Sequence, residues 1–264
     1  MTIRVNNWLP QYLKALFILS QTYTSTFQGP DPDGFYADRK QLSLSFKCFI
    51  TTLVNLIPDI NVKNIMVSYI YMDETIANTL LEDSSLTNFF IVYPELKNIL
   101  EQSPKYNYSY TIFLDHCLQS EDLMFKWVYL LQTYIYISMN KYGNYIKIPT
   151  FNQTKNMYNT DNMSKDDWGN ALWFIIHTTS LYSTLNINET FENYKALLSC
   201  LQYLLPCPKC RNHLRSNLAL INIDYCKGSN ERLFECSWRL HNIVNRSLNK
   251  YEPTLQEARN YYNF

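Results

Sequence analysis

The amino-acid sequence predicts an all-α protein, from its composition, its hydrophobic spacing and its turn residues. Only 5 of the 264 residues are glycine, whereas 47% are hydrophobic and 16% are aromatic. This apolar content is enough for a core, and scarce glycine with long runs of Leu, Ile, Asn, Lys and Tyr is typical of helices. Apolar residues recur at helical spacing in segments that turn residues separate. We therefore expect helices along most of the chain.

Five apolar segments with helical spacing occupy the first half of the chain. Turn residues separate them at positions 29–34 (Gly-Pro-Asp-Pro-Asp-Gly), 58–59 (Pro-Asp) and 103–104 (Ser-Pro). The predicted helices cover residues 8–23, 42–57, 62–81, 86–100 and 110–139. Residues 1–139 are therefore expected to form a helical domain without a redox motif.

The second half begins after residues 140–165, which are rich in Asn, Lys, Tyr and Thr, lack periodicity and are predicted to be a linker. Ser164 lies three residues before Asp167, a spacing that resembles a capping box at a helix start. Ser229 or Asn230 can cap a later helix. The predicted helices run to about residue 182, over about 189–205, from the Pro206–Cys210 segment to about 218, and to about 249. Residues 166–264 are expected to form the second domain.

The charge balance and the chain ends exclude several classes of function. Lysine plus arginine equals aspartate plus glutamate at 23 each, so no basic surface for nucleic acid is expected. The longest apolar runs, residues 15–19 and 124–131, are too short to span a bilayer. The amino terminus lacks the cleavage site of a secretory signal. We expect an intracellular protein without a signal peptide.

The seven cysteines include one Cys-x-x-Cys motif, formed by Cys207 and Cys210. A zinc site needs a second ligand pair, and His213, Cys226 and Cys236 do not supply one at a suitable spacing. A thioredoxin-like motif normally follows a strand, whereas helices are predicted on both sides here. A redox dithiol at a helix start is favoured, because free backbone N–H groups and the helix dipole lower the pKa of a thiol there. Zinc remains the less favoured alternative.

A dithiol that oxygen reoxidises needs an electron acceptor, which a flavin could provide. No Gly-x-Gly-x-x-Gly occurs, so a Rossmann-type pocket is excluded and the pocket must be built from helices. Trp173 and His177 are four residues apart and share one helix face, as do His241 and Asn245. Taken singly, each of these residues is more readily explained by a structural role.

Three segments taken together resemble the Erv/ALR family of FAD-linked sulfhydryl oxidases. They read W-G-x-x-x-W-x-x-x-H-T at 168–178, P-C-x-x-C at 206–210 and H-N-x-V-N-x-x-L-x-K at 241–250. The resemblance covers about residues 165–251 and implies a helical bundle that holds FAD. It implies that Cys207 is the outer, interchange cysteine and that Cys210 gives electrons to the flavin. It also implies a set of cofactor-binding residues in and beside these motifs: Gly169, Trp173, His177, Tyr182, Trp238, His241, Asn242, Asn245 and Lys250. No metal site is expected.

The resemblance implies an enzyme that makes disulfides in thiol-bearing proteins and passes the electrons through FAD to O2, giving hydrogen peroxide. Members of the family often carry a second cysteine pair on a tail, which passes electrons from substrates to the core disulfide. This sequence departs from that pattern, since no second closely spaced cysteine pair occurs. Trp238 stands where a family cysteine commonly lies, and the C-terminal structural cysteines are absent. A disulfide between Cys226 and Cys236 stays open, because spacing does not determine how closely their Cα atoms approach.

Within the family, the long helical first half resembles the baculovirus-type viral enzymes. There, that half resembles a decayed oxidase domain and packs on the second as a pseudo-dimer. A viral protein of this type would act in the host cytoplasm or nucleus and in the virion, and we expect a homodimer. Nothing in residues 1–139 repeats the redox motifs, so Trp127, His116 and Cys117 are expected to be core residues.

The three remaining cysteines outside any motif, Cys48, Cys117 and Cys200, lie in apolar helical runs and are expected to behave as small buried hydrophobic residues. The alternative function is a non-catalytic helical structural or interaction protein with bound flavin or zinc. The visible spectrum of the purified protein separates the two hypotheses.

Overall fold

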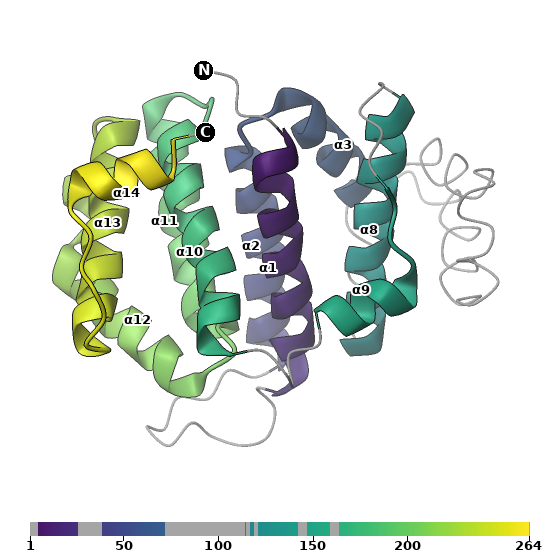
Figure 1. The fold of residues 1–264 in the computed structure, drawn as a ribbon, viewed down its shortest axis with the longest axis horizontal. Coiled ribbons are helices and arrows are strands. Elements are labelled where there is room, and N and C mark those ends of the chain that lie inside the picture. The colour runs from purple at the N-terminus through teal and green to yellow at the C-terminus, as the bar shows by residue number, and fades with distance from the viewer. Residues whose placement is uncertain are drawn as a thin grey trace. The chain divides into compact units, whose positions relative to one another are not determined.

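The computed structural model describes residues 5–25, 39–71, 114, 117–118, 121–141, 147–158 and 164–263. Within these ranges the regular secondary structure is helical and contains no strand, which confirms the all-α prediction (Figure 1). None of the helices described is both long enough and apolar enough to cross a membrane. The predicted helix at 86–100 and residues 72–81 of the third predicted helix lie outside the described residues, as does His116.

The chain forms two compact units, residues 1–60 with 155–264 and residues 61–154. This grouping differs from the predicted division into residues 1–139, 140–165 and 166–264. The reason is packing between distant segments. Helices α1 (Val5–Ser25) and α2 (Arg39–Leu56) are predicted to belong to the first domain, yet they bury their apolar faces against helices of the second.

The first unit is organised around two central helices, α10 (Lys165–Tyr182) and α11 (Ile187–Leu204). Helix α10 packs against α1 and against α13 (Asn230–Ser247), whereas α11 packs against α2 and α12 (Pro208–Ile221). The contact between α2 and α11 is the most extensive between any two described helices. Helices α1 and α2 are therefore part of the core of this unit.

The starts of the central helices follow from side-chain capping. The capping box predicted at α10 is confirmed: the Asp167 N–H donates to Ser164 Oγ at 3.2 Å, and the Ser164 N–H donates to the Asp167 carboxylate at 3.1 Å. These hydrogen bonds lower the pKa of Asp167. Asn186 caps α11, and Ser229 caps α13 by accepting from the Arg232 N–H at 3.2 Å. Local chemistry therefore determines where these helices begin.

Two short helices and one 3-10 helix, η3 (Ile223–Cys226), were not predicted. Helix α9 (Phe151–Met157) lies in the predicted linker, and α14 (Leu255–Tyr261) follows α13. Thr150 exchanges hydrogen bonds with Gln153 before α9, and Thr254 does the same with Glu257 before α14. Both starts are therefore Thr-x-x-Gln/Glu capping boxes, a sequence signal that could have found them.

The second unit contains α3 (Ile60–Ile70) and α8 (Glu121–Lys141). Trp127 of α8 is buried, and its carbonyl accepts a hydrogen bond from the Tyr69 hydroxyl at 3.1 Å. Cys117 is buried as well, so both residues are core residues as expected.

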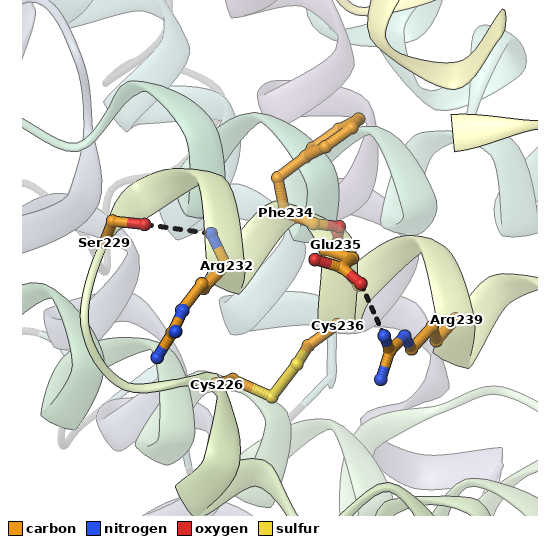
Figure 2. Close-up of a disulfide and its surroundings, with 8 residues drawn as sticks. Cys226, Ser229, Arg232, Phe234, Glu235, Cys236 and Arg239 are labelled. Atoms are coloured by element: carbon orange, nitrogen blue, oxygen red, sulfur yellow. Dashed lines mark hydrogen bonds and ion pairs between the residues drawn. A yellow bond between two sulfur atoms is a disulfide. The ribbon is translucent and has the colours of Figure 1, made fainter. Parts of the chain in front are cut away.

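Cys226 and Cys236 form a disulfide that joins η3 to α13 (Figure 2). Their Cα atoms are 6.0 Å apart, within the range that a disulfide spans. The turn between them passes through Gly228, whose φ of 137° few residues other than glycine adopt. The disulfide that spacing left open is therefore present, and it ties η3 to the second turn of α13.

Candidate active site

A cavity of about 370 Å³ lies between α10, the end of α11, α12 and α13. Its size falls in the range of small-molecule binding sites. Seven of the predicted site residues line it: Gly169, Trp173, Cys207, Cys210, His241, Asn245 and Lys250. The fold thus brings residues from all three sequence motifs to one cavity.

Cys207 and Cys210 form a disulfide at the amino-terminal end of α12, with their Cα atoms 5.1 Å apart. Cys207 is the N-cap residue, its Sγ accepts the Cys210 N–H at 3.3 Å, and Pro208 occupies the first turn. Proline suits this position because the first N–H groups of a helix have no partner within it. Both sulfur-bearing residues are partly exposed. The helix end stabilises negative charge, so it favours thiolate when the pair is reduced.

Two aromatic side chains stack on each other and form part of the cavity surface. The ring of Trp173 on α10 stacks on that of His241 on α13, with centroids 4.0 Å apart and planes inclined by 9°. Apolar side chains from α10, α11 and α12 complete the wall around it, namely Leu172, Ile176, Leu201 and Leu214. The cavity is therefore suited to a flat, largely apolar ring system.

Hydrogen bonds behind this surface determine the proton positions on two histidines. The Ser237 hydroxyl donates its single proton to the Phe234 carbonyl at 2.7 Å, so it must accept from His177 Nδ1, also at 2.7 Å. His177 Nε2 is then an acceptor and receives the proton of His241 Nδ1 at 2.9 Å. Neutral His241 is left with Nε2 as an acceptor.

The pKa values agree with neutral rings. Burial, and then the charge of His241, lower the pKa of His177 well below its usual range. Burial, and then the charge of Lys250, lower the pKa of His241 to about 4. Both histidines are therefore uncharged near neutral pH, as the chain of hydrogen bonds requires.

Four predicted site residues do not line the cavity: His177, Tyr182, Trp238 and Asn242. His177 supports the cavity from behind. The Tyr182 hydroxyl donates to the Tyr262 carbonyl at 2.8 Å. Trp238 Nε1 and Asn242 Nδ2 both donate to the Pro253 carbonyl, at 2.7 and 3.0 Å. These contacts hold the C-terminal segment against α10 and α13, and direct contact of the four residues with FAD stays a prediction.

The cavity also contains residues that sequence reasoning missed. Lys165, Asp166 and Trp168 line it in the two helical turns before Trp173, and Lys250 forms an ion pair with Asp166. Val244 on α13 and Leu248 at its C-cap extend the face of His241. The further missed lining residues include Lys209 and His213 on α12. Helical spacing from the predicted residues would have indicated several of these positions. Among the described residues, no group of three or more His, Cys, Asp or Glu could hold a metal ion.

The sequence comparisons agree with this geometry. Residues 170–263 match the profile of the Erv1/Alr family. The probable FAD-linked sulfhydryl oxidase R368 of Acanthamoeba polyphaga mimivirus is 31% identical over 98 residues, which are 36% of this chain and 68% of the relative. The chain belongs to the Erv1/Alr family. No solved structure matches the chain.

Other relatives in the Erv1/Alr family are matched over a smaller share of their length. The FAD-linked sulfhydryl oxidase ERV1 of Arabidopsis thaliana is 33% identical over 96 residues, 34% of this chain and 47% of the relative. The putative FAD-linked sulfhydryl oxidase 096R of invertebrate iridescent virus 3 is 29% identical over 87 residues, 31% of this chain and 57% of the relative. The chain therefore spans about half the length of these two curated relatives.

Proposed function

We propose that this chain is an FAD-dependent thiol oxidase that makes disulfides in thiol-bearing proteins through Cys207 and Cys210. One observation carries the proposal: the Cys207–Cys210 disulfide lies in the wall of the same cavity as the stacked Trp173 and His241. Electron transfer between a dithiol and a ring cofactor needs both in one enclosed site. The name of the mimivirus relative, a probable FAD-linked sulfhydryl oxidase, supports it.

The residues present suit FAD. Trp173 and His241 offer a flat surface for a ring system, and Lys165 and Lys209 bring positive charge to the cavity for a pyrophosphate. A Cβ added at Gly169 would meet no atom within 4 Å, so this glycine leaves space in the cavity rather than relieving a clash. When bound, FAD would supply a two-electron acceptor, from which O2 would take the electrons as hydrogen peroxide.

The chain's own residues carry the exchange of disulfides. A substrate thiolate attacks Cys207 Sγ, the bond to Cys210 breaks, and Cys210 leaves as a thiolate. A second substrate thiolate then attacks the substrate sulfur bound to Cys207, forming the substrate disulfide and releasing the Cys207 thiolate. Two substrate thiols are thereby oxidised, and the Cys207–Cys210 pair is reduced by two electrons. The start of α12 stabilises the thiolates that form.

The finer features of the proposal rest on the family resemblance and on the relatives. We propose residues 166–264 as the oxidase domain, O2 as the terminal acceptor and a homodimer as the assembly. Relatives in mimivirus and iridescent virus 3 support a viral protein that acts inside the host cell, in cytoplasm or nucleus, and is carried in the virion. Size-exclusion chromatography with light scattering tests the homodimer.

The test compares wild type with two matched variants, Cys207→Ser and Cys210→Ser. Wild type is expected to purify yellow and to consume oxygen with dithiothreitol. Both variants should fall to background turnover yet stay yellow, because the cavity wall around Trp173 remains. Cys207→Ser should also show a long-wavelength absorbance band, since it leaves Cys210 as a free thiolate beside the flavin.

Three results would contradict parts of the proposal. A colourless wild type would contradict the assignment of FAD as cofactor. Turnover retained in Cys210→Ser would contradict the catalytic role of the Cys207–Cys210 disulfide. A yellow wild type without thiol oxidation would favour a structural protein that binds flavin. If the long-wavelength band came from Cys210→Ser instead, the roles of the two cysteines would be reversed.

A further inference from the structure

Cys48 and Cys200, which the sequence treats as independent residues, are neighbours in the first unit. Cys48 lies on α2 and Cys200 on α11, and the structure has both as free thiols. Their side chains are hydrogen-bonded to each other. Cys200 is buried, whereas Cys48 is partly exposed, which corrects the expectation that Cys48 is buried. The two thiols therefore form a pair in which one residue is partly exposed and the other is buried.

A second contact shows that the helix packing places this pair. Asn55 Nδ2 on α2 donates to Asn193 Oδ1 on α11 at 2.9 Å. Asn55 lies seven residues after Cys48, and Asn193 lies seven residues before Cys200. Seven residues are about two helical turns, so both contacts lie on one face of each helix. The helices thus run antiparallel in a single register that brings Cys48 and Cys200 together.

We propose that Cys48 and Cys200 are an oxidisable pair that closes to a disulfide between α2 and α11. The register of the two helices places these sulfurs opposite each other, so a disulfide with its bond length of about 2.0 Å requires them only to close the remaining gap. The site is separate from Cys207–Cys210 in the cavity and from the Cys226–Cys236 disulfide. It does not depend on FAD or on the proposed oxidase activity.

The pair is chemically asymmetric. The hydrogen bond from Cys200 lowers the pKa of Cys48 to about 7, whereas that bond and burial raise the pKa of Cys200. Because the thiolate is the nucleophile, Cys48 is the sulfur that reacts first. A low-molecular-weight disulfide such as glutathione disulfide is the oxidant.

Two exchange steps complete the oxidation. The Cys48 thiolate attacks one sulfur of glutathione disulfide, whose S–S bond breaks and releases one glutathione thiolate. Cys200 then loses its proton to solvent and attacks Cys48 Sγ, which releases the second glutathione. In total the two cysteine thiols are oxidised to one disulfide and glutathione disulfide is reduced to two glutathiones.

The cross-link would connect α2 to the helix that leads directly into Cys207. It would also close a long loop of the chain, from residue 48 to residue 200, which restricts the unfolded state. The midpoint of thermal unfolding should therefore rise by roughly 5–10 °C.

The experiment treats the full chain with glutathione disulfide, alkylates the remaining thiols in denaturant and maps the unreduced peptides by mass spectrometry. We expect a linked pair of peptides containing Cys48 and Cys200, lighter by two hydrogens than the separate peptides. The unfolding midpoint should rise in wild type and in the control Cys117→Ala, but not in Cys48→Ser or Cys200→Ser. If a serine variant fails to fold, the wild-type peptide map decides alone.

Two outcomes would overturn the proposal. In the first, Cys48 forms a mixed disulfide with glutathione but no link to Cys200. In the second, both cysteines are still alkylated after the treatment. Either result would mean that α2 and α11 hold the sulfurs too rigidly to bond. Neither depends on flavin or on oxygen consumption, so failure here leaves the proposed oxidase function untouched.

Discussion

Two pairs of helices in the first unit, α10 with α13 and α2 with α11, each join distant segments of the chain. The side chains between the helices differ from one pair to the other. Between α10 and α13 lie two neutral histidines and Ser237, beside a cavity that contains the Cys207–Cys210 disulfide. Helices α2 and α11 instead pack along an extensive contact and contribute many apolar residues to the core. Their polar contacts include the Asn55–Asn193 pair and the cysteine pair. The first pair builds a site, and the second supports it.

The comparison shows that helix packing alone does not make a site. Large side chains of α2 and α11 are buried in the core, among them Phe49 and Leu53 of α2 and Leu197 of α11. A cavity remains beside α10 and α13, where Gly169 has no Cβ and α12 begins with a disulfide. Support and chemistry can therefore be disrupted separately.

Removing the supporting helices should have the largest effect. Residues 160–264 produced alone would expose the faces of α10 and α11 that α1 and α2 cover. Trp8 and Tyr12 are among the fully buried side chains lost, and each such burial contributes about 1.5–3 kcal/mol. We expect aggregation or loss of flavin, measured by solubility and by absorbance against the full chain. A soluble, yellow and fully active fragment would show that the first half is a separable module.

Acid should disrupt the site more than the supporting pair. Because the pKa values of His177 and His241 are lowered in the folded state, the unfolded chain binds protons that the folded chain does not. Stability is therefore complete above the unfolded pKa of about 6.5 and falls as the pH drops toward the folded pKa of about 4 for His241. The slope should reach about 1.4 kcal/mol per pH unit for each histidine.

Urea unfolding between about pH 7 and about pH 5 measures this slope, because few carboxylates titrate there. His241→Gln should flatten the dependence. His213→Gln offers a matched control, since it makes the same substitution at an exposed histidine that lines the same cavity. Equal slopes in all three proteins would contradict the assignment to the buried histidines.

The sequence predicted the features that depend on local chemistry. The starts of α10 and α13 follow from Ser164 and Ser229, and the three motifs reach one cavity as the family resemblance implies. Features that depend on packing between distant segments were missed. Trp238 lies on the same helix as the third motif and was predicted to bind the cofactor, yet it contacts Pro253 and does not line the cavity. The reason is that neighbouring segments determine which side of a helix faces a cofactor. For the same reason no local signal pairs Cys48 with Cys200.

The smallest expected effect comes from a single hydroxyl between the supporting helices and the site. Tyr12 on α1 contacts Thr178 on α10 through a buried hydrogen bond of 2.9 Å. In Tyr12→Phe the Thr178 hydroxyl still donates to the Phe174 carbonyl, so no donor is left without a partner. The loss should be about 1 kcal/mol, the usual net contribution of one such bond.

Urea unfolding should detect this loss, while flavin content and turnover stay as in wild type. Tyr12→Leu is the matched comparison, because it also removes ring contacts with Trp8 and Phe174, at centroid distances of 4.8 and 6.4 Å. It should destabilise the protein further, by about 2 kcal/mol or more in total. Loss of flavin from Tyr12→Phe would show that α1 shapes the cavity through Thr178, and the separation between support and chemistry would then fail at α10.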